Sequence, residues 1–214
     1  MKELPAPVVL VTKLFALTQV EIVVEYALKS GGVDLVARVT VSGHPGSGTS
    51  TLVDGLCEEF GWTKLNGGQV FRDMAKNHSM TLEEFGHYCE NNEHVDKKLD
   101  SLLADTIAKP ESPEIIESRL AGWWAFRGSH ECHRIWIEVS EAIRASRIVS
   151  REGGTIQDRI PLIRERMESD RARYLEYYGI DIDSTEPYTI VIEASDLDAI
   201  SVLALVKKHL EVQI

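Results

Sequence analysis

From residue 34 onward, short runs of β-branched residues alternate with longer stretches in which apolar residues recur every three or four positions. The short runs predict strands and the longer stretches predict helices, the pattern of a parallel sheet with crossover helices. The expected strands are residues 36–42, 62–65, 114–117, 134–139 and 188–193. The expected helices are residues 50–60, 69–77, 82–90, 95–108, 119–126, 141–151, 156–178 and 197–212. The pattern therefore predicts the α/β class, with three layers and a parallel sheet of about five strands that carries helices on both faces.

Residues 1–35 lie outside this alternation. Residues 8–28 are the most apolar part of the chain, but Lys13, Glu21 and Glu25 interrupt them, and each charge is costly at the centre of a bilayer. The segment also lacks the basic start and the small-residue cleavage site of a signal peptide. We expect an appended amphipathic helix or helix–strand unit, and an upstream extension with no essential role stays open. The chain thus divides into an extension of unknown role, residues 1–35, and one domain, residues 36–214.

The overall charge is acidic, because 23 Lys and Arg face 34 Asp and Glu among 214 residues, which gives −11 at pH 7. This balance argues against nucleic acid as a partner and against a permanent place on anionic lipid. The three cysteines are widely spaced, which fits a reducing cytoplasm. The run from His130 to His133 invites a zinc site, but no second ligand pair stands at zinc spacing, so a polar loop is favoured. Any anionic ligand must therefore be held by a local cluster of positive groups.

A glycine-rich turn between the first expected strand and its helix is the most specific local feature. It comprises Gly43, His44, Pro45, Gly46, Ser47, Gly48, Thr49, Ser50 and Thr51. The spacing is that of the P-loop, G-x-x-x-x-G-K-[ST], except that Thr49 stands in place of the lysine. The amides of such a loop bind phosphate, and the Ser50 hydroxyl is positioned to bind Mg²⁺. A Gly/Ser linker before a helix is the alternative. With the lysine missing, arginines elsewhere must neutralise the phosphates.

Two expected helices carry clustered arginines. Arg144, Arg147 and Arg151 share one face of residues 141–151, and Arg166 and Arg173 lie on one side of residues 156–178. Guanidinium groups bind phosphate bidentately and stay charged, although i,i+4 pairs with acidic residues would equally suit a solvated helix face. Two further arginines, Arg72 and Arg119, should lie near the carboxyl edge of the sheet, where ligands gather in α/β proteins. For either of these two alone, an ordinary surface arginine is the alternative.

Six segments in order resemble the short, archaeal-type cytidylate kinases, and the resemblance runs from residue 36 to the end of the chain. They are Ser42-Gly-His-Pro-Gly-Ser-Gly-Thr-Ser-Thr51, Val70-Phe-Arg-Asp-Met-Ala75, Met80-Thr-Leu-Glu-Glu-Phe85, Glu117-Ser-Arg-Leu-Ala-Gly-Trp123, Arg151-Glu-Gly153 and Arg173-Tyr-Leu-Glu-Tyr-Tyr-Gly-Ile-Asp-Ile182. The resemblance implies the P-loop NTPase fold, a segment that binds the nucleoside monophosphate at about residues 67–109, and a lid at about 151–170. It also implies that ATP, with Mg²⁺, phosphorylates CMP or dCMP.

The resemblance implies a role for each arginine. Arg72 and Arg119 would contact the acceptor monophosphate, and Arg147 would belong to the ATP side. Arg151, Arg166 and Arg173 would be catalytic, closing over the site and neutralising charge during transfer. Residues 43–51 would hold the ATP phosphates, with Ser50 as the metal ligand. We further expect a cytoplasmic monomer that binds neither nucleic acid nor membrane.

Three positions depart from the pattern of the family and keep alternatives open. Thr49 replaces the P-loop lysine, which leaves a non-catalytic nucleotide-binding module as one alternative. Gln69 stands where an acidic residue is usual, which leaves AMP or UMP as an alternative acceptor. Ser118 replaces a glycine before Arg119 and shifts where that arginine can reach.

Overall fold

The computed structural model describes residues 37–109 and 112–211. Within these ranges the chain forms a five-stranded sheet in the order β2-β3-β1-β4-β5, and every neighbouring pair of strands is parallel. The strands are β1 (Val39–Gly43), β2 (Lys64–Asn66), β3 (Ile115–Glu117), β4 (His133–Glu138) and β5 (Ile190–Glu193). The predicted α/β class and the parallel sheet are confirmed. The expected N-terminal extension, residues 1–35, lies outside the described residues.

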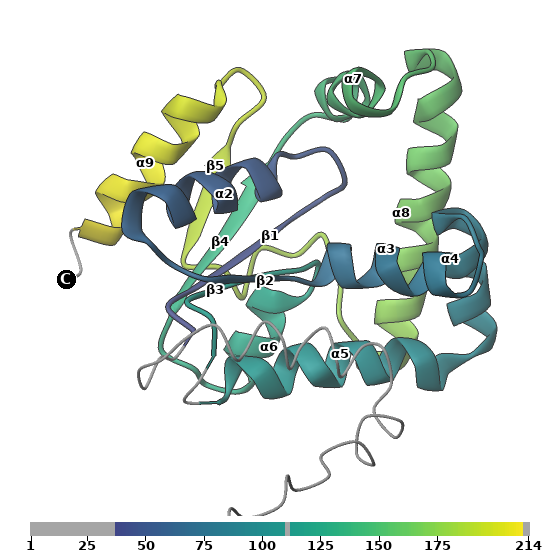
Figure 1. The fold of residues 1–214 in the computed structure, drawn as a ribbon, viewed down its shortest axis with the longest axis horizontal. Coiled ribbons are helices and arrows are strands. Elements are labelled where there is room, and N and C mark those ends of the chain that lie inside the picture. The colour runs from purple at the N-terminus through teal and green to yellow at the C-terminus, as the bar shows by residue number, and fades with distance from the viewer. Residues whose placement is uncertain (1–36, 110–111, 212–214) are drawn as a thin grey trace, which may run out of the picture.

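Helices pack on both faces of the sheet (Figure 1). They are α2 (Thr49–Phe60), α3 (Gly67–Asn77), α4 (Leu82–Asn91), α5 (Glu93–Ile107), α6 (Ala121–Arg127), α7 (Glu141–Glu152), α8 (Ile156–Tyr178) and α9 (Ala199–Glu211). Val39 and Val41 of β1 pack with α2 and α9, whereas Ile116 of β3 packs with α5 and α6 on the opposite face. Alternate residues of a strand point to opposite faces, so two separate cores flank one sheet.

Outside the sheet, two helical units border the carboxyl ends of the strands. The first is α3, α4 and α5, which covers the segment expected to bind the monophosphate. The second is α7 and α8, which are joined by Gly153 and Gly154, both with positive φ, and which include the expected lid at residues 151–170. α4 packs against α8, so the two units meet across the edge of the sheet (Figure 1).

Local sequence signals account for where several helices begin. Thr81 caps α4 by accepting a hydrogen bond from the Glu84 amide, while the Glu84 side chain accepts one from the Thr81 amide, which completes a capping box. The Thr155 side chain caps α8 in the same position by accepting from the Asp158 amide. α6 begins later than the helix expected at 119–126, because the Ser118 amide still donates to the Val41 carbonyl. Arg119 therefore lies in the turn after β3.

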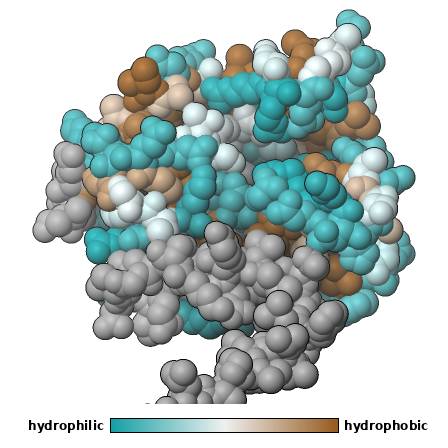
Figure 2. Space-filling model, in the orientation of Figure 1, coloured by the Kyte–Doolittle hydropathy of each residue, from teal (hydrophilic) through white to brown (hydrophobic). Residues whose placement is uncertain are grey.

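The surface is largely hydrophilic on the face shown in Figure 2, and hydrophobic groups are scattered in small patches, one of them over α9. There Ile200 is 79% exposed. Within residues 37–109 and 112–211, no helix is both long enough and apolar enough to cross a bilayer. The apolar segment 8–28 lies outside this search.

Candidate active site

The loop between β1 and α2 has the backbone geometry of a phosphate cradle. Gly46 and Gly48 have φ of 83° and 92°, a region in which L side chains are strained. A Cβ on Gly46 would also lie 2.7 Å from the Arg144 carbonyl oxygen. Gly48 directly precedes α2, so the first amides of this helix face the loop. The sequence therefore needs glycine at both positions to turn the backbone amides inward, as phosphate binding requires.

Two of the clustered arginines of α7 donate hydrogen bonds to backbone carbonyls of this loop. Arg147 donates from Nη1 to the Ser47 carbonyl at 2.9 Å and from Nη2 to the Ala194 carbonyl at 3.2 Å. Arg144 is buried and donates from Nη1 to the Pro45 carbonyl at 3.3 Å. These contacts tie the loop to the end of β5 and to α7. Arg147 is outside the set of residues that line the adjacent cavity, and its expected contact with ATP stays a prediction.

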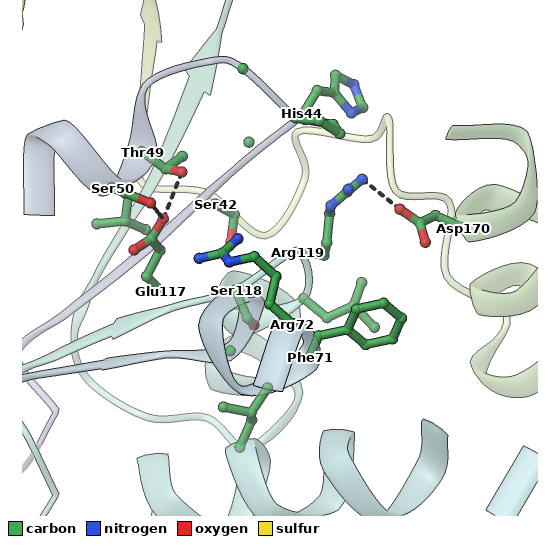
Figure 3. Close-up of a pocket in the computed structure, with 18 of the residues that line it drawn as sticks. Ser42, His44, Thr49, Ser50, Phe71, Arg72, Glu117, Ser118, Arg119 and Asp170 are labelled. Carbon is green, nitrogen blue, oxygen red and sulfur yellow. Dashed lines mark hydrogen bonds and ion pairs between the residues drawn. The ribbon is translucent and has the colours of Figure 1, made fainter. Parts of the chain in front are cut away.

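At the end of β3, the Glu117 carboxylate lies beside Thr49 and Ser50 of the loop (Figure 3) and also contacts β2. Thr49 and Ser50 each donate a hydroxyl hydrogen bond to Oε1 at 2.7 Å, and Asn66 donates from Nδ2 to Oε2 at 2.6 Å. Burial raises the pKa of Glu117, while the two hydroxyl hydrogen bonds act in the opposite direction. We had no role for Glu117 from the sequence, although an acidic residue that ends a buried strand beside β1 was a usable signal.

The oxygen donors beside Ser50 fit a magnesium ion. A hydroxyl and a carboxylate are hard ligands of the kind that Mg²⁺ prefers, and Glu117 lies in the wall of the same cavity as Ser50. Within the described ranges no three His, Cys, Asp or Glu side chains are grouped so as to hold a metal ion. The expected metal ligand Ser50 therefore lies beside a second candidate ligand, the Glu117 carboxylate, for which the sequence gave no role.

A cavity of about 200 Å³ opens in front of the loop, between α3, α5 and α8. Its wall includes eight of the nine expected loop residues, and five arginines converge on it from four parts of the fold. They are Arg72 of α3, Arg119 after β3, Arg151 of α7, and Arg166 and Arg173 of α8. Every arginine that was expected to contact the acceptor or to take part in catalysis thus lines the same cavity. Their individual roles stay predictions.

Asp170 of α8 organises the arginines at the centre of the cavity. Its Oδ2 lies 2.6 Å from Nη1 of Arg119 (Figure 3). Its Oδ1 accepts from Nη2 of Arg173 at 2.6 Å. Arg166 is on the same helix, and burial together with the charge of Arg119 lowers the pKa of its guanidinium. An anion between two guanidinium groups is the arrangement that a phosphate would also adopt. The sequence offers Asp170 only as an i,i+4 partner of Arg166 on a solvated helix face, whereas in the fold it pairs with Arg119 and Arg173.

Arg72 and Arg151 are more exposed than the arginines around Asp170. Arg72 donates from Nε and Nη2 to Oε1 of Gln69, at 3.1 and 2.8 Å. Gln69 therefore holds Arg72 through its amide oxygen, as a carboxylate at this position could. Arg151 forms an ion pair with its neighbour Glu152 and reaches the cavity from the end of α7.

His44 links the loop to the segment after α8. Its Nε2 lies 3.1 Å from Oδ1 of Asp183, whose Oδ2 accepts from Nε and Nη2 of Arg171 at 2.9 and 2.7 Å. Burial, with help from the charges of Arg119 and Arg144, lowers the pKa of His44 to about 4 against the opposing effect of Asp183. The imidazole is therefore neutral at pH 7.

This lowered pKa predicts an acid-dependent loss of stability. In the unfolded chain His44 titrates at its ordinary pKa of 6.5, so the unfolded state takes up the proton first as pH falls. We expect the free energy of unfolding to decrease between about pH 6.5 and 4 by about 2–3 kcal/mol from this group. His44→Gln should flatten this part of the profile in chemical denaturation followed at several pH values. Parallel profiles for the two proteins would contradict the assignment.

The chain is similar to known proteins in sequence and in fold. The model of a family described as AAA domain matches residues 42–174. The chain is 38% identical over 173 residues to a cytidylate kinase of Pyrococcus furiosus, covering 81% of this chain and 88% of that protein. It is 34% identical over 176 residues to a cytidylate kinase of Archaeoglobus fulgidus, covering 82% and 96%. A shikimate kinase of Bacteroides thetaiotaomicron has the same fold, with a TM-score of 0.53 at 14% identity over 82% and 98% of the two chains.

Proposed function

The chain belongs to the cytidylate kinase family and to the broader AAA domain family, and we propose that it transfers the γ-phosphoryl group of ATP to CMP or dCMP. The products are ADP and CDP or dCDP. The observation that carries the proposal is the match to archaeal cytidylate kinases over most of both chains. The cavity supports it, since an amide-lined loop and five arginines border one space in a protein whose net charge is −11.

The loop end of the cavity suits the donor nucleotide. The loop amides from Gly43 to Thr49 and the N-terminus of α2 would hold the ATP phosphates, because aligned amides favour negative charge. Ser50 and Glu117 would hold Mg²⁺, which would neutralise negative charge on the phosphates during transfer. Arg144 and Arg147 keep the loop rigid through its carbonyls, so the amides are preorganised before ATP arrives.

The opposite side of the cavity suits the acceptor monophosphate. Arg119 and Arg72 would bind its phosphate, while Arg166, Arg173 and Arg151 would spread charge away from the group in transfer. The phosphate would displace the Asp170 carboxylate from its position between Arg119 and Arg173. Catalysis then consists of aligning two nucleotides and neutralising the charge between them, with no general base required.

Binding of two nucleotides requires the helical units to separate and then close. Sites for a single drug-sized ligand occupy roughly 300–1,000 Å³, whereas the cavity here is about 200 Å³. Polar contacts join α4 to α8: His87 Nε2 lies 3.5 Å from Oε1 of Glu165, and Ser169 donates to Glu90. We propose that these contacts break on substrate entry and reform around the bound pair, excluding water that would otherwise accept the phosphoryl group.

An acceptor panel tests the proposed function. Purified protein with ATP and Mg²⁺ is supplied separately with CMP, dCMP, AMP and UMP, and release of ADP is followed by a coupled assay. We expect turnover with CMP or dCMP well above that with AMP or UMP. Absence of ADP release with both cytidylates, from folded protein that binds ATP, would overturn the proposal and favour a binding module. A clear preference for AMP or UMP would change the acceptor only.

Thr49 gives a further prediction about the loop. Its hydroxyl bonds to Glu117, and its methyl group lies beside Gly43, where a Cβ would be 3.1 Å away. We expect Thr49→Lys to leave ATP affinity unchanged or to tighten it several-fold, because the added ammonium group faces the phosphates. Calorimetric titration of ATP measures this, with the melting temperature as the control for folding. Loss of ATP binding in a folded variant would show that the loop requires threonine.

We also propose a cytoplasmic location and a monomeric state, with ATP and a cytidylate as the ligands. The acidic net charge and the spacing of the three cysteines support the location. All five cavity arginines come from one chain, which supports a monomer.

A further inference from the structure

A contact between the phosphate loop and the segment after α8 joins parts of the site that are far apart in the chain. His44 follows Gly43 in the loop, and its Nε2 lies 3.1 Å from Oδ1 of Asp183. His44 lines the cavity and is buried, with 9% of its surface exposed. Because a carboxylate only accepts, Nε2 carries the proton of the neutral imidazole and donates it to Asp183. The loop proposed to hold ATP is therefore bonded directly to the segment that follows α8.

The His44 ring has little freedom to turn. It packs edge-to-face with the buried Trp136 ring of β4, and the two ring centroids are 5.0 Å apart. The His44 carbonyl accepts from the Ser47 amide at 3.1 Å, which closes a tight turn of the loop. A buried polar ring costs free energy unless it is hydrogen-bonded, so the contact with Asp183 selects one orientation of the imidazole. This orientation in turn fixes the loop backbone at His44.

Asp183 is held in place on the side away from His44. Its Oδ2 accepts from Nε and Nη2 of Arg171 at 2.9 and 2.7 Å. The preceding residues Ile180 and Ile182 are buried in a core cluster that also contains Tyr174 of α8. A carboxylate that is supported in this way can set the position of the residue that it contacts.

Arg171 connects these contacts to the residues proposed to act on the phosphoryl group. It lies on α8 between Asp170 and Arg173, and both of these line the cavity. The contacts from Arg171 through Asp183 to His44 therefore link the arginine side of the cavity to the loop that would hold the donor. Transfer depends on the distance between the two sides, and a misplacement of about 1 Å can slow a reaction by about 100-fold.

We propose that Asp183 is a positioning residue for phosphoryl transfer, which acts through His44 to hold the phosphate loop in register with the arginines of α8; this inference rests on the proposed function. Asp183 is outside the set of residues that line the cavity, so it acts without touching substrate. Loss of its contact with His44 slows the transfer step more than it weakens the binding of either nucleotide. The reason is that each nucleotide keeps its own ligands, and only their relative position changes.

The substitution Asp183→Asn tests the proposal with almost no change of shape. The oxygen of the amide can take the place of Oδ1 or of Oδ2, but not of both. If the NH2 group faces His44, the imidazole must move its proton to Nδ1, a buried atom that has no hydrogen-bond partner among the described residues. We expect kcat with CMP to fall by about 10- to 100-fold, while KM for CMP and KM for ATP each change by less than about threefold.

Glu186→Gln is the matched control, since Glu186 is an exposed carboxylate of the same segment and lies outside the cavity lining. It should keep the wild-type kcat. The melting temperature of each variant shows the fraction that is folded in the assay. A purely structural role for Asp183 would lower the melting temperature and leave kcat of the folded fraction unchanged, and this result would overturn the proposal.

A double-mutant cycle shows whether Asp183 acts through His44. The substitution His44→Phe keeps a ring against Trp136 but has no N–H to donate. In that background Asp183→Asn should lower kcat by less than about threefold further, because the contact that it removes is already absent. An effect as large as in the wild-type background would place the effect on Arg171 and overturn the route through His44.

The tautomer of His44 tests the same contact without a variant of Asp183. Proton–nitrogen correlation spectra of the imidazoles at neutral pH, with the His44 signals assigned from their absence in His44→Gln, should show the proton on Nε2. A proton on Nδ1 would overturn the proposal even if Asp183→Asn does not fold.

The kinetic outcomes separate this inference from the proposed function. If the wild type uses AMP or UMP instead of a cytidylate, the proposed acceptor fails, and kcat of the variants is compared with the acceptor that the protein uses. If the wild type phosphorylates a cytidylate and folded Asp183→Asn keeps its kcat, the inference alone is overturned. Absence of transfer to every acceptor by the folded wild type overturns both.

Discussion

Replacing Arg119 by alanine should lower kcat/KM for CMP by about 10²–10³-fold, the cost of removing one preorganised charge from a transferring group. Arg119 is held on the cavity wall by Asp170, in the turn between β3 and α6, where it can meet the acceptor phosphate. It makes no contact with the loop between β1 and α2 among the hydrogen bonds of the described residues. ATP affinity should therefore change less than threefold.

Arg164→Ala is the matched control for this prediction. Arg164 lies on α8 like Arg166 and Arg173, but it is exposed and donates to Glu141 of α7 at 2.8 and 2.7 Å. Steady-state kinetics with CMP as the varied substrate should show nearly wild-type values for it. If Arg119→Ala weakens ATP and CMP equally, Arg119 is not an acceptor ligand. A melting temperature for each variant shows whether Asp170, left with Arg173, destabilises the fold.

The periodicity of the chain predicted every strand and helix that the structure describes, because each element has its own apolar pattern and a clear end. The boundaries that shifted are those set by tertiary contacts. β1 ends at Gly43, one residue beyond the expectation, where its register with Ile137 of β4 ends. The glycine spacing predicted the phosphate loop for a similar reason: positive φ at Gly46 and Gly48 is a local requirement that the sequence must satisfy by itself.

The sequence could not assign the arginines of α7, although it placed them on one face. Arg144 and Arg147 hold loop carbonyls whereas Arg151 reaches the cavity, and only the packing of α7 against the loop decides which does which. The pairing of Asp170 with Arg173 could be predicted in part, since the two residues have the spacing of an i,i+3 pair. Its second partner, Arg119, comes from a distant part of the chain and has no local signal. The same is true of Asp183, which meets His44 only in the fold.

Glu117→Gln should lower kcat with Mg²⁺ and CMP by about 10²–10³-fold, although the side chain keeps its size. The amide offers one acceptor and one donor where the carboxylate offers two acceptors. Thr49 and Ser50 both donate to Oε1, and the Asn66 amide group donates to Oε2. Glutamine can therefore keep the two hydroxyls as donors only by turning its NH2 group against that of Asn66. In the reverse orientation its NH2 group donates to the hydroxyls, and no acceptor oxygen remains beside Ser50.

Asn66 cannot relieve this conflict by turning its amide over. Its Oδ1 accepts from the Gln69 amide at 2.8 Å and so caps α3, the helix that carries Arg72. Turning the amide would break this cap, which is worth about 1 kcal/mol. One substitution at the end of β3 thus disturbs either the proposed magnesium ligands or the Asn66 contact beside the acceptor helix, because a single carboxylate serves both.

Glu114→Gln is the matched control, because Glu114 precedes the same strand at its other end and accepts from the Thr63 amide and hydroxyl at 2.9 and 2.7 Å. This variant should have a lower free energy of unfolding. Its activity should fall only in proportion to the fraction of protein that is unfolded in the assay. For Glu117→Gln, titration of Mg²⁺ at saturating ATP should show a raised half-saturation concentration, while ATP affinity without metal stays within a few-fold of the wild type. Wild-type dependence on Mg²⁺ together with a full loss of kcat would instead place Glu117 in the architecture of the loop and remove it from the metal site.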